Sequence, residues 1–456
     1  MSAVAQKHDE APEAPLAKMA AFVVDGAPPA EARERSAAAV MDTIGVALAG
    51  AAEPAARIVR QTIATAADAP CSVWGSEARS SAPDAALANG TAAHALDYDD
   101  MCFVSLAHPS APLVPALVAA GEVAGASGRA VVDAYAVGFE IQARLGRAMN
   151  PRHYQRGWHC TSTLGTVSAA AGASRLLGLD AAATMHALAI AASSASGLKE
   201  NFGTMVKPLH AGLAARNGVL AALLAKAGLT GSARAFDGPQ GYLHALDSER
   251  ADLAGETADL GRRWEILETG VTVKLYPSCA GTHPTLDALL DLRARERFAA
   301  DDVDRIEIDV DAIVPTILLY DRPVSALEAK FSMPFCAAAA VVFGRVGIDT
   351  FDDDRIRDPK VTSLMARVTM RVDDQIGQGK PALTESRVRV RLKDGRMLAQ
   401  DAHGARGYPA NPASDADLAS KFIACATRVR SATHAGEALA TLRKIDQLGS
   451  IRDFVA

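Results

Sequence analysis

The chain has 456 residues, a formal net charge of −6 and an isoelectric point near 6.0. This charge excludes a general attraction to nucleic acid or to an anionic membrane, so an anionic ligand requires a local basic pocket. Hydrophobic residues make up 49% and charged residues 22%, which is typical of a soluble globular enzyme, and the length suffices for two domains with separate cores.

The N-terminus and the cysteines indicate the compartment. The six cysteines are scattered and form no C-x-x-C pair, which favours reduced thiols over a disulfide framework or a zinc site. Residues 1–17 are expected to be a flexible N-terminus, because they are polar and lack the apolar stretch of a secretory signal. The apolar run 40–50 is interrupted by Asp42 and Thr43 and is too short to span a bilayer. We therefore expect a cytoplasmic protein.

From about residue 28 to residue 228 the chain predicts one helix after another. Small residues dominate these stretches, and Gly or Pro separates them. The many alanines allow close approach of neighbouring helices, as in a large bundle with few aromatic residues. The strongest helix predictions are 29–48, 83–95, 113–126, 131–149, 161–177, 181–195 and 208–227.

After about residue 260 the pattern changes. Residues in three stretches alternate as in half-buried strands, and Lys393-Asp394-Gly395-Arg396 predicts a hairpin turn into a fourth strand. A helix interrupted by Pro334 is predicted between them, at 326–343, and a helix capped by Ser414 or Asp415 follows later. The predicted strands are 305–310, 368–372, 387–392 and 397–399, and the last helix is 417–429.

The predicted fold class is mostly α. We expect a large, all-helical domain formed by both ends of the chain, from residues 18–264 plus 406–456. A smaller α+β domain is expected to be inserted between them, at 265–405.

Three times a basic residue precedes a proline and then a helix-forming run: His108-Pro109, Lys207-Pro208 with His210 in the same turn, and His283-Pro284. Proline is favourable in the first turn of a helix, where free N–H groups and the helix dipole attract anions. A cation there opposes the dipole, which favours a functional role for Lys207. Three such starts indicate one site for a substrate with several negative charges.

The segment that precedes His108 carries three carboxylates within four residues, at Asp97, Asp99 and Asp100. Such clusters are typical of a metal site, of an acid/base site with shifted pKa values, or of a solvated loop. Spacing alone does not choose between the last two, but no H-E-x-x-H or similar pattern supports metal ligands. Equally, His159 before a helix and Lys274 before a helix start each have a structural or solvated alternative. No dinucleotide, Walker or G-x-S-x-G motif is present.

Together these segments resemble the MmgE/PrpD family, which includes 2-methylcitrate dehydratase, cis-aconitate decarboxylase and iminodisuccinate epimerase. The resemblance runs from about residue 18 to 445. It implies a large helical domain, a smaller α+β lid domain with the site between them, a homodimer, and no metal or organic cofactor. The motifs that carry it are A-H-A-L-D-Y-D-D (93–100) with H-P-S (108–110), N-F-G-T-M-x-K-P-L-H-A-G-x-A-A-R-N-G (201–218), K-L-Y-P-S-C-A-G-T-H-P (274–284) and A-K-F-S-M-P-F (329–335).

The resemblance also implies site residues. The family's residues match here at Asp97, His108, His159, Lys207 and Lys274, with Tyr320 a looser match. We predict catalytic roles for Asp97, His108, His159 and Lys207, and substrate binding for Lys274, His210, His283 and Tyr320. Two positions depart from the family: Met101 stands where many members have Thr, and so does Val206.

The residues and the resemblance predict the same chemistry. Lysines and helix starts stabilise the charge that develops when a proton or a carboxyl group leaves carbon next to a carboxylate. A histidine serves as base, with His159 assisted by Asp97 as the first assignment and exchange with His108 left open. The leading hypothesis is a cofactor-free lyase, a dehydratase or decarboxylase, acting on a small di- or tricarboxylate. The alternatives are an isomerase or epimerase on a similar carboxylate, and a catalytically silent dimer that binds carboxylates.

Overall fold

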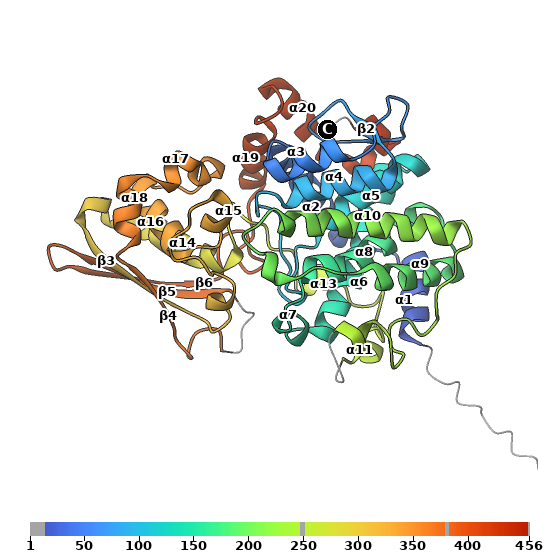
Figure 1. The fold of residues 1–456 in the computed structure, drawn as a ribbon, viewed down its shortest axis with the longest axis horizontal. Coiled ribbons are helices and arrows are strands. Elements are labelled where there is room, and N and C mark those ends of the chain that lie inside the picture. The colour runs from blue at the N-terminus through green and yellow to red at the C-terminus, as the bar shows by residue number, and fades with distance from the viewer. Residues whose placement is uncertain (1–13, 247–250, 379–382, 455–456) are drawn as a thin grey trace, which may run out of the picture.

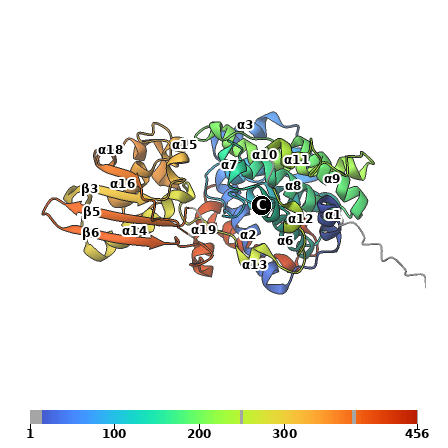
Figure 2. The same ribbon diagram turned by 90° about the horizontal axis from the view of Figure 1, so that it is seen from below.

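The computed structural model describes residues 14–246, 251–378 and 383–454. Of the segment 1–17, expected to be flexible, residues 1–13 lie outside the described residues, and the first helix begins at Pro15. The molecule has two parts that lie side by side along its longest axis (Figures 1 and 2).

The larger part is a helical body. The helices predicted between residues 28 and 228 are confirmed, with ends that agree to within a few residues. One small exception to an all-helical body is an antiparallel pair of two-residue strands, β1 (Cys71–Ser72) and β2 (Arg79–Ser80). The helices are α1 (Pro15–Asp25), α2 (Ala30–Gly50), α3 (Pro54–Thr62), α4 (Ala82–His94), α5 (Ser110–Ala124), α6 (Gly128–Met149), α7 (Arg152–Gln155), α8 (Cys160–Leu176), α9 (Ala181–Ser194), α10 (Val206–Lys226), α11 (Tyr242–Leu246), α12 (Leu253–Glu256) and α13 (Glu265–Glu268).

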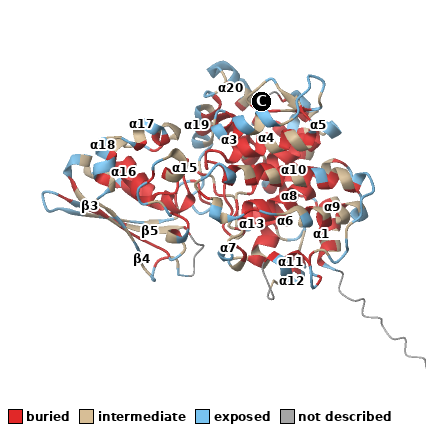
Figure 3. Cartoon of the chain, viewed as in Figure 1, coloured by how far each residue is buried: buried red, intermediate tan, exposed pale blue. Residues whose placement is uncertain are grey.

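Helices α4, α5, α8 and α10 form the centre of this body, where most residues are buried (Figure 3). Helices α4 and α10 approach so closely that glycine is required on both. A Cβ added to Gly90 would lie 2.9 Å from the Cα of Gly212, closer than carbon atoms pack. This contact matters for the site, because α4 ends at His94 and α10 starts beside Lys207.

The smaller part is a four-stranded sheet with helices packed on it. The strand order is β4-β3-β5-β6, in which β3 and β4 are parallel and the other neighbours are antiparallel. Buried and more exposed residues alternate along β5, as the sequence predicts. The elements are the 3-10 helix η2 (Ala280–Thr282), α14 (His283–Glu296), β3 (Val303–Val310), α15 (Ala326–Ala329), α16 (Met333–Phe343), α17 (Asp353–Ile356), α18 (Pro359–Met365), β4 (Val368–Val372), β5 (Glu385–Leu392) and β6 (Met397–His403).

One helix prediction in this part needs correction. The segment 326–343 is not one helix interrupted by Pro334 but two helices, α15 and α16. Pro334 lies in the first turn of α16, where its missing N–H would have no partner in any case, and Ser332 caps that turn.

After the sheet the chain returns to the helical body as α19 (Asp415–Ala426) and α20 (Ala432–Leu442), at the top of Figure 1. Ser414 is the N-cap of α19. Helix α19 packs on α2, and Lys421 Nζ lies 2.8 Å from Asp42 Oδ2 and donates to the Tyr98 carbonyl at 2.9 Å. Both ends of the chain therefore build the helical body, and the mostly α fold with an inserted α+β part is confirmed.

All six cysteines are buried. Within the described ranges, no single helix combines the length and apolar composition that crossing a membrane requires, and one bent pair, α2 with α3, meets the criterion by length and composition only.

Candidate active site

A narrow cavity lies where the two parts meet. Its free volume is ≈ 30 Å³, which is small beside the roughly 300–1,000 Å³ of most ligand pockets. The helical body contributes Asp97, Met101, Leu106, His108, Tyr154, His159, Phe202 and Lys207, and the smaller part contributes Cys279, Ala280, Ile317, Phe331 and Leu383.

Asp97 is the electrostatic centre of this cavity. Lys207 Nζ donates to Asp97 Oδ1, while Lys274 Nζ donates to the Asp97 carbonyl at 3.0 Å and lies 3.2 Å from Oδ2. Burial by itself would raise the pKa of Asp97, but the two ammonium groups outweigh it and hold that pKa well below its usual value. The carboxylate is therefore ionised at neutral pH. Its φ of 51° is a left-handed conformation that Asp adopts more readily than most residues.

Lys207 lies in the first turn of α10, as predicted, and Asp97 supplies the anion that the helix N-terminus favours. Its ammonium group also lies 5.5 Å from the ring centre of Phe202 and 5.1 Å from that of Phe331. Because Phe202 belongs to the helical body and Phe331 to the smaller part, Lys207 is positioned by both walls of the cavity.

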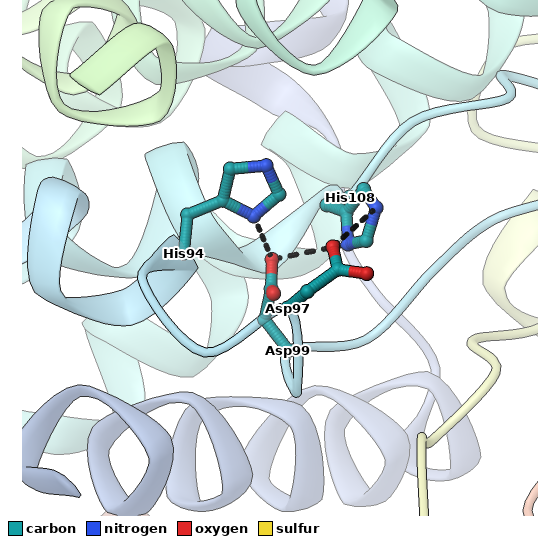
Figure 4. A group of neighbouring side chains, drawn as sticks. All are labelled: His94, Asp97, Asp99 and His108. Carbon is teal, nitrogen blue, oxygen red and sulfur yellow. Dashed lines mark hydrogen bonds and ion pairs between the residues drawn. The ribbon is translucent and has the colours of Figure 1, made fainter. Parts of the chain in front are cut away.

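Asp99 contacts two histidines, His94 and His108, and His108 also lies near Asp97 (Figure 4). Its Oδ2 is 2.7 Å from His94 Nδ1 and 3.1 Å from His108 Nδ1, and His108 Nε2 is 3.7 Å from Asp97 Oδ1. Burial would raise the pKa of Asp99, but the two imidazoles lower it well below its usual value. Burial lowers the pKa of His94 to about 3 and also lowers that of His108, so both rings are neutral at pH 7.

These groups include four that offer metal-ligand atoms within 4.8 Å of one another: His94, Asp97, Asp99 and His108. Three of them lie close together in the sequence, at His94, Asp97 and Asp99, and the fold adds His108. Two ammonium groups already occupy Asp97, and a divalent ion here would repel both of them. The donor set therefore fits an ion-paired acid/base site better than a metal centre.

His159 is the N-cap residue of α8 and lines the same cavity. Its Nδ1 lies 3.1 Å from His210 Nδ1, and its ring stacks on His94 at 5.6 Å between centres. Burial, followed by the charges of His94 and Lys207, lowers the pKa of His159 well below its usual value. The expected assistance from Asp97 is not formed, because Asp97 pairs with Lys207 and Lys274 instead.

The four predicted catalytic residues line the cavity, whereas the four predicted substrate-binding residues stand behind its walls. Lys274 is fully buried against Asp97, and His210 supports His159. Tyr320 donates from its hydroxyl to the Phe202 carbonyl at 2.9 Å, so it joins the smaller part to a wall residue of the helical body.

His283 departs most from expectation. It lies in the first turn of α14, as predicted, but its Nε2 is 3.1 Å from the Ser278 carbonyl and its ring packs against Tyr276 and Tyr408. Burial lowers its pKa to about 3, so it carries no charge at pH 7. The expectation of three cationic helix starts around one polyanionic substrate is therefore wrong for His283.

The sequence reasoning missed the apolar walls and the roles of His94 and Asp99. Phe202 and Phe331 lie inside the motifs that contain Lys207 and Lys330, so these motifs could have identified them. No such motif contains Ile317 or Leu383. Of the two departures from the family pattern, Met101 lines the cavity and Val206 does not; 37% of its surface is exposed.

Lys330 was also missed. Its side chain is buried, with no hydrogen bond or ion pair within the described part of the chain, and burial lowers its pKa to about 8. Asp97 exerts a weaker, opposite effect on that pKa, which places Lys330 within electrostatic reach of the site.

Comparison with known proteins decides the family. Sequence models of the MmgE/PrpD N-terminal domain and C-terminal domain match residues 15–252 and 276–447. The chain belongs to the MmgE/PrpD family. The second match runs past the sheet and includes α19 and α20, which pack on the helical body.

Several known proteins are similar to this chain along most of its length. Human cis-aconitate decarboxylase is 30% identical over 413 residues, which is 87% of this chain and 84% of that protein. The mouse cis-aconitate decarboxylase is 28% identical over 432 residues, 91% and 86% of the two chains. A cis-aconitate decarboxylase-like protein of Aspergillus oryzae is 29% identical over 426 residues, 88% and 87%.

Proposed function

We propose that this protein is a cofactor-free lyase that removes CO₂, or alternatively water, from a small di- or tricarboxylate. The observation that carries the proposal is the arrangement of Lys207, Asp97 and His108 in one buried cavity between the two parts. The names of the similar proteins favour decarboxylation over dehydration.

In a decarboxylation, the bond between carbon and the leaving carboxylate breaks and CO₂ departs. The electron pair left behind moves onto the neighbouring unsaturated carbon or carboxylate, and carbon then takes a proton that His108 Nε2 has accepted from solvent, which returns the ring to its neutral form. The ammonium group of Lys207 stabilises this developing negative charge, and it does so strongly because the site is shielded from water. In a dehydration the same charge develops when the proton next to a carboxylate leaves, and the hydroxyl group departs as water.

We assign the proton transfer to His108 and not to His159. Asp99 lies beside His108, favours its protonated form and opposes the effect of burial on its pKa. His159 contacts His210 and His94, which both disfavour a positive charge. His108 therefore accepts and returns a proton more readily near neutral pH. In this proposal His159 borders the substrate, and Lys274 holds the carboxylate of Asp97 in place.

The experiment that tests the proposal is NMR spectroscopy of the purified protein in deuterated water with a panel of small carboxylates, beginning with cis-aconitate. Loss of CO₂ or water, with the corresponding change in alkene signals, supports a lyase. Exchange of a substrate proton with solvent, without elimination, contradicts it in favour of an isomerase or epimerase. Binding without any reaction across the panel contradicts it in favour of a carboxylate-binding protein.

A further inference from the structure

We infer that Asp99 is the positioning residue that sets the tautomer of His108, leaving the Nε2 lone pair of that ring free to accept a proton. The inference rests on the proposed function for its catalytic consequence. The structural part, which nitrogen of His108 carries the proton, stands on the geometry of four side chains.

The side chain of Asp99 is fully buried, and its Oδ2 faces both His94 Nδ1 and His108 Nδ1, at 2.7 and 3.1 Å. Its Oδ1 has no hydrogen-bond partner. A carboxylate can only accept, and a neutral imidazole carries a proton on one nitrogen alone. His94 therefore donates from Nδ1 to Asp99 Oδ2. We assign the proton of His108 to Nδ1 as well, because the carboxylate oxygen nearest to this ring, Asp99 Oδ2, lies 3.1 Å from that nitrogen, and both Nε2 atoms are then left without a proton.

Asp97 competes for the same ring. It lies on the opposite side of His108, with Oδ1 at 3.7 Å from Nε2. If Asp97 took the proton, the lone pair would sit on Nδ1, which is buried and out of reach of a substrate. Asp97 is the weaker acceptor for two reasons: its contact is longer, and Lys207 and Lys274 already occupy it. The difference between the two carboxylates thus selects the useful tautomer.

His94 completes the arrangement. Its ring packs edge-on to His108 at 4.6 Å, and its Nδ1 fixes the orientation of Asp99. The contact between His108 Nδ1 and Asp99 Oδ2 has the length of a hydrogen bond but not its direction, since this nitrogen has no hydrogen-bond partner in the structure. The backbone next to the ring is held as well, since His108 N donates to Thr161 Oγ1 at 3.0 Å.

The titratable groups around His108 are Asp97 and Asp99 on its own loop, His94 at the end of α4, His159 at the start of α8, Lys207 on α10 and Lys274 before η2.

The first test needs no substrate. In ¹⁵N-histidine-labelled full-length protein at pH 7.5, two-bond ¹⁵N–¹H correlations identify the tautomer of each ring, and His108→Gln assigns the signal of His108. We expect the Nδ1–H form for His108. An Nε2–H form in the wild-type protein overturns the inference, even if every proposed reaction is confirmed.

The second test is Asp99→Asn, with Asp100→Asn as the matched control. Asp100 is equally buried, but it bonds Ser110 and burial raises its pKa to about 7, so its amide is a close mimic of the protonated acid. For Asp99→Asn we expect loss of the single tautomer and a fall in kcat of about 10²-fold or more, with a smaller change in KM. Loss of the anion also lowers the pKa of His108, so the acidic limb of the pH–rate profile moves to lower pH.

The control is expected to keep the Nδ1–H form and the wild-type pH profile. Unchanged turnover and an unchanged profile in Asp99→Asn would overturn the inference. If that variant does not fold, the wild-type tautomer still decides. An Nδ1–H form in a protein that transforms no carboxylate would refute the proposed function while leaving the assignment of the tautomer intact.

Discussion

Replacing Lys207 with alanine separates the catalytic and structural roles of the site. Lys207 lines the cavity and bonds Asp97, which also has Lys274 as a partner. Removing Lys207 therefore leaves the buried carboxylate with one of its two cationic partners. The fold should survive this change, whereas the reaction loses the only ammonium group that lines the cavity within the described residues.

The two costs differ in size. A hydrogen bond to a charged group contributes about 1.5–3 kcal/mol to stability, which corresponds to a fall in melting temperature of roughly 2–5 °C for a domain of about 300 residues. The 3–5 kcal/mol cost of an unpaired buried charge does not apply, because Lys274 remains. Loss of one preorganised donor that stabilises transition-state charge lowers kcat by about 10²–10³-fold.

Both quantities are measured on one sample, by differential scanning calorimetry and by NMR turnover of the substrate that the panel identifies. Lys274→Ala is the matched variant: it removes the other partner of Asp97 from behind the wall, so it should lower the melting temperature at least as much. Turnover by Lys207→Ala within tenfold of the wild type would refute the assigned role. If Lys207→Ala fails to fold, Lys274 by itself is not enough to stabilise the buried carboxylate of Asp97.

Three further outcomes are expected. Activity should survive exhaustive dialysis against EDTA, because lysines occupy the carboxylate that a metal would need; a loss restored by one specific metal ion would contradict this. The protein should be a homodimer at micromolar concentration, as the family resemblance implies, and multi-angle light scattering that reports the mass of a monomer would count against it. Buried His94 and His283, each with a pKa of about 3, should make stability fall as the pH drops below about 6.5, because these rings bind a proton there only in the unfolded chain; Asp100 and Glu140, whose pKa values are raised to about 7, act in the opposite direction. The share of each histidine is about 1.4 kcal/mol per pH unit in that range, so the urea midpoints at pH 7 and pH 5 are compared between the wild type and His283→Gln, and the same change of midpoint in both proteins would refute the argument.

The helices and strands were predictable because their signals are local. Spacing of apolar residues and the Gly and Pro between stretches act within a few residues of each element, so even the end of the 368–372 strand is correct. Pro334 shows the limit of such reading. The same residue can break a helix or begin one, and the choice depends on Ser332, which caps the second helix.

The site was predictable only in part, because a side chain's direction depends on distant packing. His108, Lys207 and His283 share one local pattern, yet only the first two reach the cavity, while His283 turns toward Tyr276 and Tyr408. Similarly, the acidic cluster has no internal feature that distinguishes Asp97 from Asp99. Their separate partners, two lysines and two histidines, come from α10, from the segment before η2, from the end of α4 and from the start of α5.

The bond from Lys421 to the Tyr98 carbonyl has a consequence for the order in which the protein becomes active during synthesis. Tyr98 lies between Asp97 and Asp99, and its carbonyl accepts a hydrogen bond from Lys421, which is translated more than three hundred positions later. The same ammonium group is bonded to Asp42. The helical body has most of its residues available long before α19 leaves the ribosome. Lys207, Lys274 and His94 hold the two carboxylates of this loop, and the Tyr98 carbonyl between them gains its Lys421 partner only when that last stretch docks on α2. A nascent or C-terminally truncated chain should therefore contain the site residues without this one attachment of their loop.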